Sequence, residues 1–167
     1  MGLFNFIKSA GEKLFGMHKD ASEESAELDE SKKEQIEAEN IRAAHKLEQK
    51  IHDNNLEIKD LKVEIEKDMA SVSGLAKSQS TREKIILVVG NVEGIAQVED
   101  NMEVENKEPE AIFHTVEQGD TLSGIAKEHY GNANKYQVIF EANKPMLKDP
   151  DKIYPGQVLR IPSEDIK

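Results

Sequence analysis

The side chains most able to attack a substrate or hold a transition metal are the histidines. They are His18, His45, His52, His114 and His129. None has the spacing of an H-E-x-x-H zinc motif, and no G-x-S-x-G or phosphate-binding loop accompanies them. His45 and His52 lie one heptad apart on a polar segment, so we expect the histidines to be solvated. Asp149–Asp151 lacks the glycine and the final glutamate of an EF-hand loop. The sequence therefore predicts a non-enzyme, with no catalytic residues.

A second kind of chemistry needs only the main chain. The stretch GNVEGI, Gly90–Ile95, follows a predicted helix. The last carbonyl groups of a helix have no intrahelical partner, and the helix dipole makes this end negative. Two glycines allow backbone conformations that other residues avoid. The alternative interpretation is a plain helix stop, with Gly90 left-handed and Gly94 in an ordinary loop.

Composition and charge limit the partners. The net charge is −11; residues 1–110 carry 15 Lys/Arg and 25 Asp/Glu, whereas residues 111–167 carry 7 and 8. No basic face is available for phosphates, which argues against a nucleic-acid ligand. No apolar run of about 18 residues predicts a membrane-spanning helix. The first residues lack the features of a secretory signal, and the absence of cysteine fits a reducing compartment. We expect a cytoplasmic protein that does not engage a membrane.

The elements that position these residues begin with an amphipathic pattern in residues 1–16. Leu3, Ile7, Ala10 and Leu14 recur at spacings of four, three and four, which predicts a helix. Such a helix either lies on a membrane surface or docks on the next domain. Its two lysines make a thin basic face for a membrane, so we favour docking. The acidic residues 17–30 predict a linker.

Residues 31–105 predict an α+β layer. The expected elements are a helix from Ser31 to about Asn54, a hairpin with strands at 61–66 and 70–74, a helix capped by Ser78 or Ser80 and reaching Val89, and a strand from Ile95. The hairpin turns at Lys67–Asp68. A helix, a hairpin, a helix and a strand in this order place the helices on one face of a sheet.

Residues 106–111 contain Pro109 and predict a linker, and residues 112–163 predict a second small domain. Its expected elements are a strand IFHTV, a helix capped by Asp120 or Thr121, a helix over about 135–142, and a strand QVLRIP with Leu159 and Ile161 inward. The βααβ order lets the two strands pair antiparallel, backed by both helices.

Here the residues resemble known families. V-x-x-G-D-T-L-x-x-I-A from Val116 and I-Y-P-G-Q-x-L-x-I-P from Ile153 resemble the two ends of a LysM domain. Residues 31–105 are similar to a BON domain in their αββαβ order, with V-x-G-x-x-x-S from Val72 and V-x-G-I from Val92. With the N-terminal MGLFNF, this arrangement resembles the small bacterial cytoplasmic potassium-binding proteins in which BON precedes LysM. The long acidic stretch at 20–45 departs from that pattern.

The LysM resemblance implies a shallow groove for N-acetylglucosamine glycans such as peptidoglycan or chitin. Carried onto this chain, the groove comprises Gly119, Asp120, Thr121, Leu122, Asn143, Ile153 and Tyr154. These positions also have plain structural uses as turn, helix cap and core.

The potassium-binding resemblance implies one K⁺ ion held by main-chain oxygens. K⁺ is large and weakly hydrated, so a cage of neutral carbonyls suits it. The candidate ligands are the carbonyls of Ile7, Ala10, Gly90, Val92, Gly94 and Ile95. In this hypothesis the ion joins the N-terminal segment to the GNVEG loop, compacts the BON domain and docks LysM. We expect a monomer that senses potassium or acts in stress. The alternatives are a glycan-binding envelope protein and a structural stress protein without a small ligand.

Overall fold

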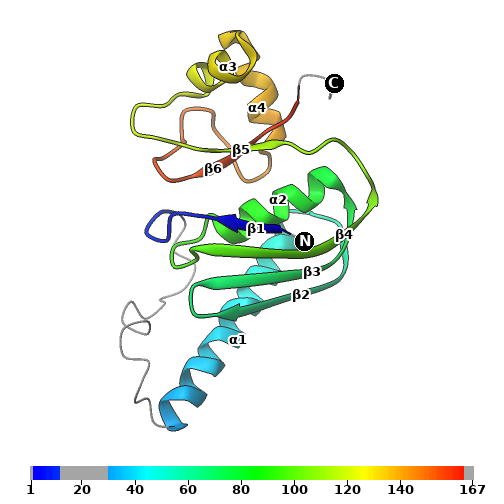
Figure 1. The fold of residues 1–167 in the computed structure, drawn as a ribbon, viewed down its shortest axis with the longest axis vertical. Helices are drawn as coiled ribbons and strands as arrows, with labels where there is room; N and C mark the ends of the chain where they lie inside the picture. The colour runs from blue at the N-terminus through cyan, green and yellow to red at the C-terminus, as the bar shows by residue number, and fades with distance from the viewer. Residues whose placement is uncertain (1, 12–29, 164–167) are drawn as a thin grey trace.

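The computed structural model describes residues 2–11 and 30–163, which form an α+β protein of two small domains (Figure 1). We call residues 2–106 the N-terminal domain and residues 112–163 the C-terminal domain. The predicted two-domain α+β class is confirmed. Residues 12–16 of the expected helix and residues 17–29 of the expected linker lie outside the described residues.

The N-terminal domain is one sheet with two helices. Its elements are β1 (Gly2–Asn5), α1 (Glu30–Asp53), β2 (Ile58–Glu66), β3 (Met69–Ser78), α2 (Gln79–Gly90) and β4 (Gln97–Asn106). The strand order is β1-β4-β3-β2; β3 and β4 are parallel, and the other pairs are antiparallel. Because parallel neighbours need a crossover, α2 must return the chain across the sheet between β3 and β4. The αββαβ order is confirmed, with β1 added to it.

The hydrophobic pattern explains this layer. Alternate residues of β3, including Ala70 and Val72, are fully buried beneath the helices. The apolar residues of α1 pack on the same core, where Leu47 and Ile51 are 0% exposed. Ser78 caps α2 by accepting a hydrogen bond from the N–H of Thr81. Over residues 30–106, the hydrophobic pattern and the helix cap read from the sequence therefore agree with the burial seen in the structure.

The predicted N-terminal helix is wrong over the described residues. Residues 2–5 form β1, which pairs antiparallel with β4 from Gly2↔Asp100 to Asn5↔Gln97. Leu3 and Ile7, two members of the expected apolar face, are 56% and 46% exposed. The buried face instead carries Phe4 and Phe6, two residues apart. The open edge of β4 offers hydrogen-bond partners to the backbone of this segment. A short isolated helix is only marginally stable, so pairing with β4 is favoured over the helix that the sequence pattern predicts.

The C-terminal domain has the expected βααβ order. Its elements are β5 (Ile112–Thr115), α3 (Leu122–Tyr130), a short 3₁₀ turn η1 (Ala133–Lys135), α4 (Tyr136–Ala142) and β6 (Val158–Ile161). β5 and β6 pair antiparallel, with Ile112 opposite Ile161. Between the two residues proposed to cap α3, Thr121 is the cap, since its hydroxyl accepts from the N–H of Gly124 at 3.0 Å.

β6 joins the two domains, because both of its faces are buried. Leu159 and Ile161 enter the core of the C-terminal domain, as predicted. Val158 belongs to the core of the N-terminal domain, and Arg160 is 5% exposed. In Figure 1, α2 accordingly lies between the large sheet and the C-terminal domain.

Candidate functional site

The loop after α2 is fixed by its own turns and by the core. The side chains of Val92 and Ile95 are 0% exposed. Asn91 caps α2 by donating its N–H to the carbonyl of Leu87, and the N–H of Ile95 donates to the carbonyl of Val92 at 3.2 Å. Gly94 has a φ of 104°, a conformation that favours glycine. Gly90 is not left-handed, so the simple helix-stop interpretation fails at this residue.

The N-terminal segment packs directly on this loop. The N–H of Phe6 donates to the carbonyl of Ala96, and the N–H of Gly94 donates to the carbonyl of Lys8, both at 2.8 Å. A Cβ atom built on Gly90 would lie 2.1 Å from the Phe6 ring, so only glycine fits there. The expected docking of this segment on the N-terminal domain is thus present, although a strand and a turn perform it.

The C-terminal domain contacts both the loop and the N-terminal segment. A Cβ built on Gly156 would lie 2.6 Å from the Cβ of Ala10 and 3.5 Å from that of Ile7. The side chain of Asn91 donates to the carbonyl of Val158 at 2.8 Å and accepts from its N–H at 2.9 Å. We call the meeting of residues 6–11, 90–96 and 154–158 the three-segment junction. The six residues predicted to supply carbonyl ligands lie in the first two of these segments.

The hydrogen bonds of the junction leave acceptors unused. Among residues 2–11 and 30–163, the carbonyl of Ile7 accepts from the turn N–H of Ala10, and that of Val92 accepts from the turn N–H of Ile95. Within the described part of the chain, no hydrogen bond is accepted by the carbonyl oxygens of the other four predicted ligands: Ala10, Gly90, Gly94 and Ile95. Gly90, Gly94 and Ile95 are buried residues. Buried carbonyls in proteins are nearly always paired, and an ion or an ordered water is one kind of partner. Neutral oxygen donors of this kind fit a monovalent cation.

Comparison with known proteins assigns both domains. The BON domain model matches residues 34–106, and the LysM domain model matches residues 114–162. The potassium binding protein Kbp of Escherichia coli O6:H1 is 47% identical over 168 aligned residues, which cover 98% of this chain and 100% of that protein. The chain belongs to the Kbp family. An uncharacterized protein of Deinococcus radiodurans is 47% identical over 49 residues, 29% of this chain and 19% of its own length. None of the described helices has the length and apolar character needed to cross a bilayer.

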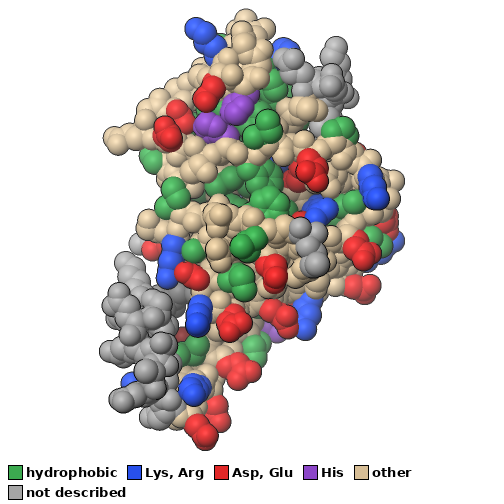
Figure 2. All heavy atoms as spheres, in the orientation of Figure 1, with side chains coloured by type: hydrophobic (Ala, Val, Ile, Leu, Met, Phe, Trp, Pro, Cys, Tyr) green, Lys and Arg blue, Asp and Glu red, His purple; other side chains and the backbone are tan. Residues whose placement is uncertain are grey.

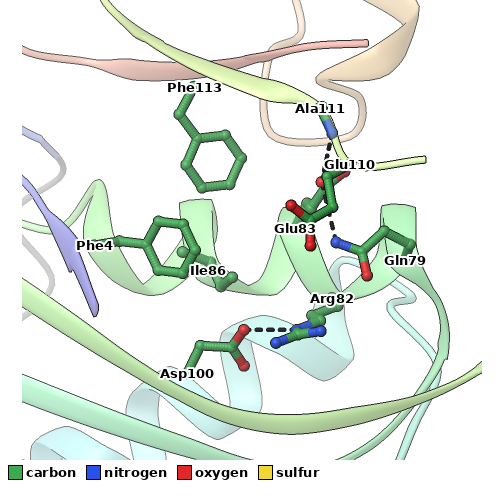
Figure 3. A pocket seen from close by; sticks show the side chains of 9 residues that line it. All are labelled: Phe4, Gln79, Arg82, Glu83, Ile86, Asp100, Glu110, Ala111 and Phe113. Atoms are coloured by element: carbon green, nitrogen blue, oxygen red, sulfur yellow. Dashed lines mark hydrogen bonds and ion pairs between the residues drawn. The ribbon is translucent and has the colours of Figure 1, made fainter. Parts of the chain in front are cut away.

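A buried ion pair crosses the interface between BON and LysM. Arg160 of β6 places Nη2 2.9 Å and Nε 3.2 Å from Oε1 of Glu83 on α2, and both side chains are at most 6% exposed. The other carboxylate oxygen of Glu83 accepts from Gln79 and from the N–H of Ala111 (Figure 3). Arg160 also donates to the carbonyl of Ala142. With every charge partnered, the pair fixes the register of docking. Sequence analysis missed it, since neither residue type nor spacing links positions 83 and 160.

A partly polar cavity lies beside this pair. Phe4 from β1 and Phe113 from β5 face one another across it, with ring centroids 5.1 Å apart. Arg82 and Asp100 form an ion pair at its floor, at 2.6 Å (Figure 3). Three of the charged side chains that line it, Arg82, Glu83 and Asp100, are therefore committed to protein partners.

The predicted glycan groove is divided between surface and interior. Leu122 is 3% exposed and belongs to the LysM core. Asn143 is 1% exposed. Its side-chain NH₂ donates to the carbonyls of Ile139 and Arg160, and its side-chain oxygen accepts from the N–H of Arg160. Thr121 and Gly119 are exposed, and there is open space around Gly119. Tyr154 and Ile153 are half-buried. Burial raises the pKa of the Tyr154 phenol. The side chains able to touch a surface ligand are thus fewer than the motif suggests.

The expectation that all histidines are solvated is wrong for His114. Its side chain is 15% exposed, with Nδ1 3.2 Å from Nε2 of His129 and Nε2 3.2 Å from the Asp120 carboxylate. His45 and His52 are exposed, as expected, and His18 lies outside the described residues. The sequence concealed the pair, because 15 residues separate a strand position from a helix end that the fold brings together.

Proposed function

We propose that this protein binds a potassium ion at the three-segment junction. The ligands are the carbonyl oxygens of Ile7, Ala10, Gly90, Val92, Gly94 and Ile95. The observation that carries the proposal is the set of buried carbonyls without a hydrogen-bond donor in the described chain. The Kbp relative, whose name states potassium binding, supports the same ion.

The junction suggests what the ion does for the molecule. Residues 6–11 come from the N-terminal segment, and residues 154–158 come from LysM, so an ion in the loop strengthens contacts on both sides. In the absence of K⁺, repulsion among aligned carbonyl dipoles opposes closure. Binding therefore shifts the population toward the docked, compact form. We propose a cytoplasmic monomer that acts as a sensor or stress-response protein and has no enzymatic activity.

A salt-swap melt tests ion binding. A site of this kind raises the free energy of unfolding by about 2.7 kcal/mol when free K⁺ is one hundred times Kd. Relief of repulsion among surface charges gives nearly equal gains in KCl and NaCl. We expect a clearly higher Tm in KCl than in NaCl at the same ionic strength, with other monovalent cations absent. Equal melting in the two salts rejects the site.

A second candidate function is binding of N-acetylglucosamine glycans by LysM, favoured by the domain match and by the open loop at Gly119–Thr121. Retention of the protein on insoluble peptidoglycan tests it. Failure to be retained, with the K⁺ response intact, removes this candidate alone.

A further inference from the structure

The His114–His129 pair has the form of a transition-metal site. The two ring nitrogens that face each other, Nδ1 of His114 and Nε2 of His129, lie 3.2 Å apart. Two imidazole nitrogens on one tetrahedral Zn²⁺ are separated by about 3.3 Å, given Zn–N distances of about 2.0–2.1 Å. The two rings are nearly perpendicular, with centroids 5.2 Å apart. The nitrogens therefore already have the spacing of one edge of a coordination tetrahedron.

A third donor lies at the same place. Glu128 precedes His129 at the end of α3, and one carboxylate oxygen of Glu128 lies within 4.8 Å of a ring nitrogen of each histidine. Glu128 is exposed, and the two histidines are half-buried. Figure 2 shows histidine side chains together at the surface of the C-terminal domain, with acidic side chains beside them. The position is open to solvent, so an ion can reach it, and water can complete the coordination.

The outer contact of His114 selects the tautomer that a metal ligand needs. Its Nε2 faces the Asp120 carboxylate at 3.2 Å, and Asp120 also accepts from the N–H of Glu117 at 2.9 Å. A carboxylate only accepts hydrogen bonds, so this contact favours neutral His114 with its proton on Nε2 and a lone pair on Nδ1. Histidine ligands of metals are commonly held in this way by a carboxylate.

We propose that His114, His129 and Glu128 form a site for one divalent transition-metal ion such as Zn²⁺. The ion enters between the two ring nitrogens and replaces their hydrogen bond. His129, if neutral, moves its proton from Nε2 to Nδ1, so that both facing nitrogens bind through lone pairs. Imidazole donors favour zinc and its neighbours over Mg²⁺ and Ca²⁺, which prefer oxygen ligands.

The site would strengthen a link between two LysM elements that the His114–His129 hydrogen bond already joins. His114 lies in β5, directly after the chain leaves BON, and Glu128 and His129 lie in the last turn of α3. An ion bound to both fixes the strand against the helix and fixes the Asp120 turn between them. The proposal does not depend on potassium, because its ligands are distant in the chain from residues 6–11 and 90–96.

Calorimetric titration of the full chain with Zn²⁺, at constant KCl, tests the proposal. We expect one saturable site in the wild type. His129→Gln removes a ligand and should weaken binding roughly 100-fold or more, and Asp120→Asn, which removes the outer contact, should weaken it about 10–100-fold. Glu128→Gln should also weaken binding, and since Glu128 is exposed this variant folds normally. His52→Gln, an exposed histidine on α1, is the matched control and should bind as the wild type does.

Three outcomes overturn the proposal. The first is the absence of saturable Zn²⁺ binding in the wild type. The second is unchanged binding in both His129→Gln and Glu128→Gln, with folding checked by circular dichroism. The third is displacement of the ion by millimolar Mg²⁺, which would assign the binding to the acidic surface.

Discussion

At the scale of single residues, the junction depends on glycines for the close approach of main chains. Phe6 lies against Gly90, and Ala10 lies against Gly156. Carbonyl ligands leave no mark on residue types, so the sequence indicated the loop only through its two glycines. The same reasoning failed for His114 and His129, whose chemistry depends on a contact between two elements. Residue types alone therefore indicated the main-chain loop as a candidate and gave no sign of the side-chain pair.

Gly94→Ala tests the loop at this scale. Alanine in a left-handed conformation costs roughly 1–2 kcal/mol, so the loop should reshape and move its carbonyls. We expect the Tm difference between KCl and NaCl to fall close to zero. Gly131→Ala is the matched control: Gly131 also has a positive φ, 71°, but it ends α3 far from the junction. It should lower the Tm equally in both salts.

An unchanged K⁺ response in Gly94→Ala would contradict the ligand set. Loss of the response in both variants would indicate that general destabilisation, and not the loop, controls it.

At the scale of elements, most of the fold followed from the hydrophobic period and the turn residues. The hairpin turned at Lys67, which has a φ of 58°, and Ser78 and Thr121 capped their helices. The structure of the N-terminal segment could not be predicted in this way, because its pattern is ambiguous. Leu3 and Ile7 have the spacing of a helix, whereas Phe4 and Phe6 have the spacing of a strand. Its outcome depended on the free edge of β4, a partner that lies about 90 residues away and that local pattern cannot reveal.

Deletion of residues 2–11 tests whether β1 and its turn complete the ion site. The deletion removes two proposed ligands, Ile7 and Ala10, and the contact of Gly94 with Lys8. The shortened protein should melt lower in any salt, since Phe6 leaves the core. The informative quantity is the Tm in KCl minus the Tm in NaCl, which should vanish. If that difference stays at its wild-type value, the N-terminal segment is not part of the site.

At the scale of the whole molecule, two of the contacts that couple BON to LysM differ in kind. Glu83 and Arg160 form a buried, fully partnered ion pair that includes none of the proposed ion ligands. Asn91 connects the candidate ion loop itself to β6, through two hydrogen bonds to Val158. In the proposed mechanism the ion acts on domain docking through Asn91, a residue whose own carbonyl is not among the proposed ligands.

Asn91→Ala should separate ion binding from docking. The variant loses two interdomain hydrogen bonds, worth about 1–3 kcal/mol together, but keeps the glycines and carbonyls of the loop. We expect K⁺ to raise the Tm of the BON domain still, while the decrease in radius of gyration measured by X-ray scattering on adding K⁺ becomes smaller. Asn106→Ala is the control, because its side chain bonds only within BON, to the carbonyl of Lys77. If Asn91→Ala compacts with K⁺ as fully as the control does, the ion acts on docking through the Ala10–Gly156 contact instead, and the loop is not the link between the two domains.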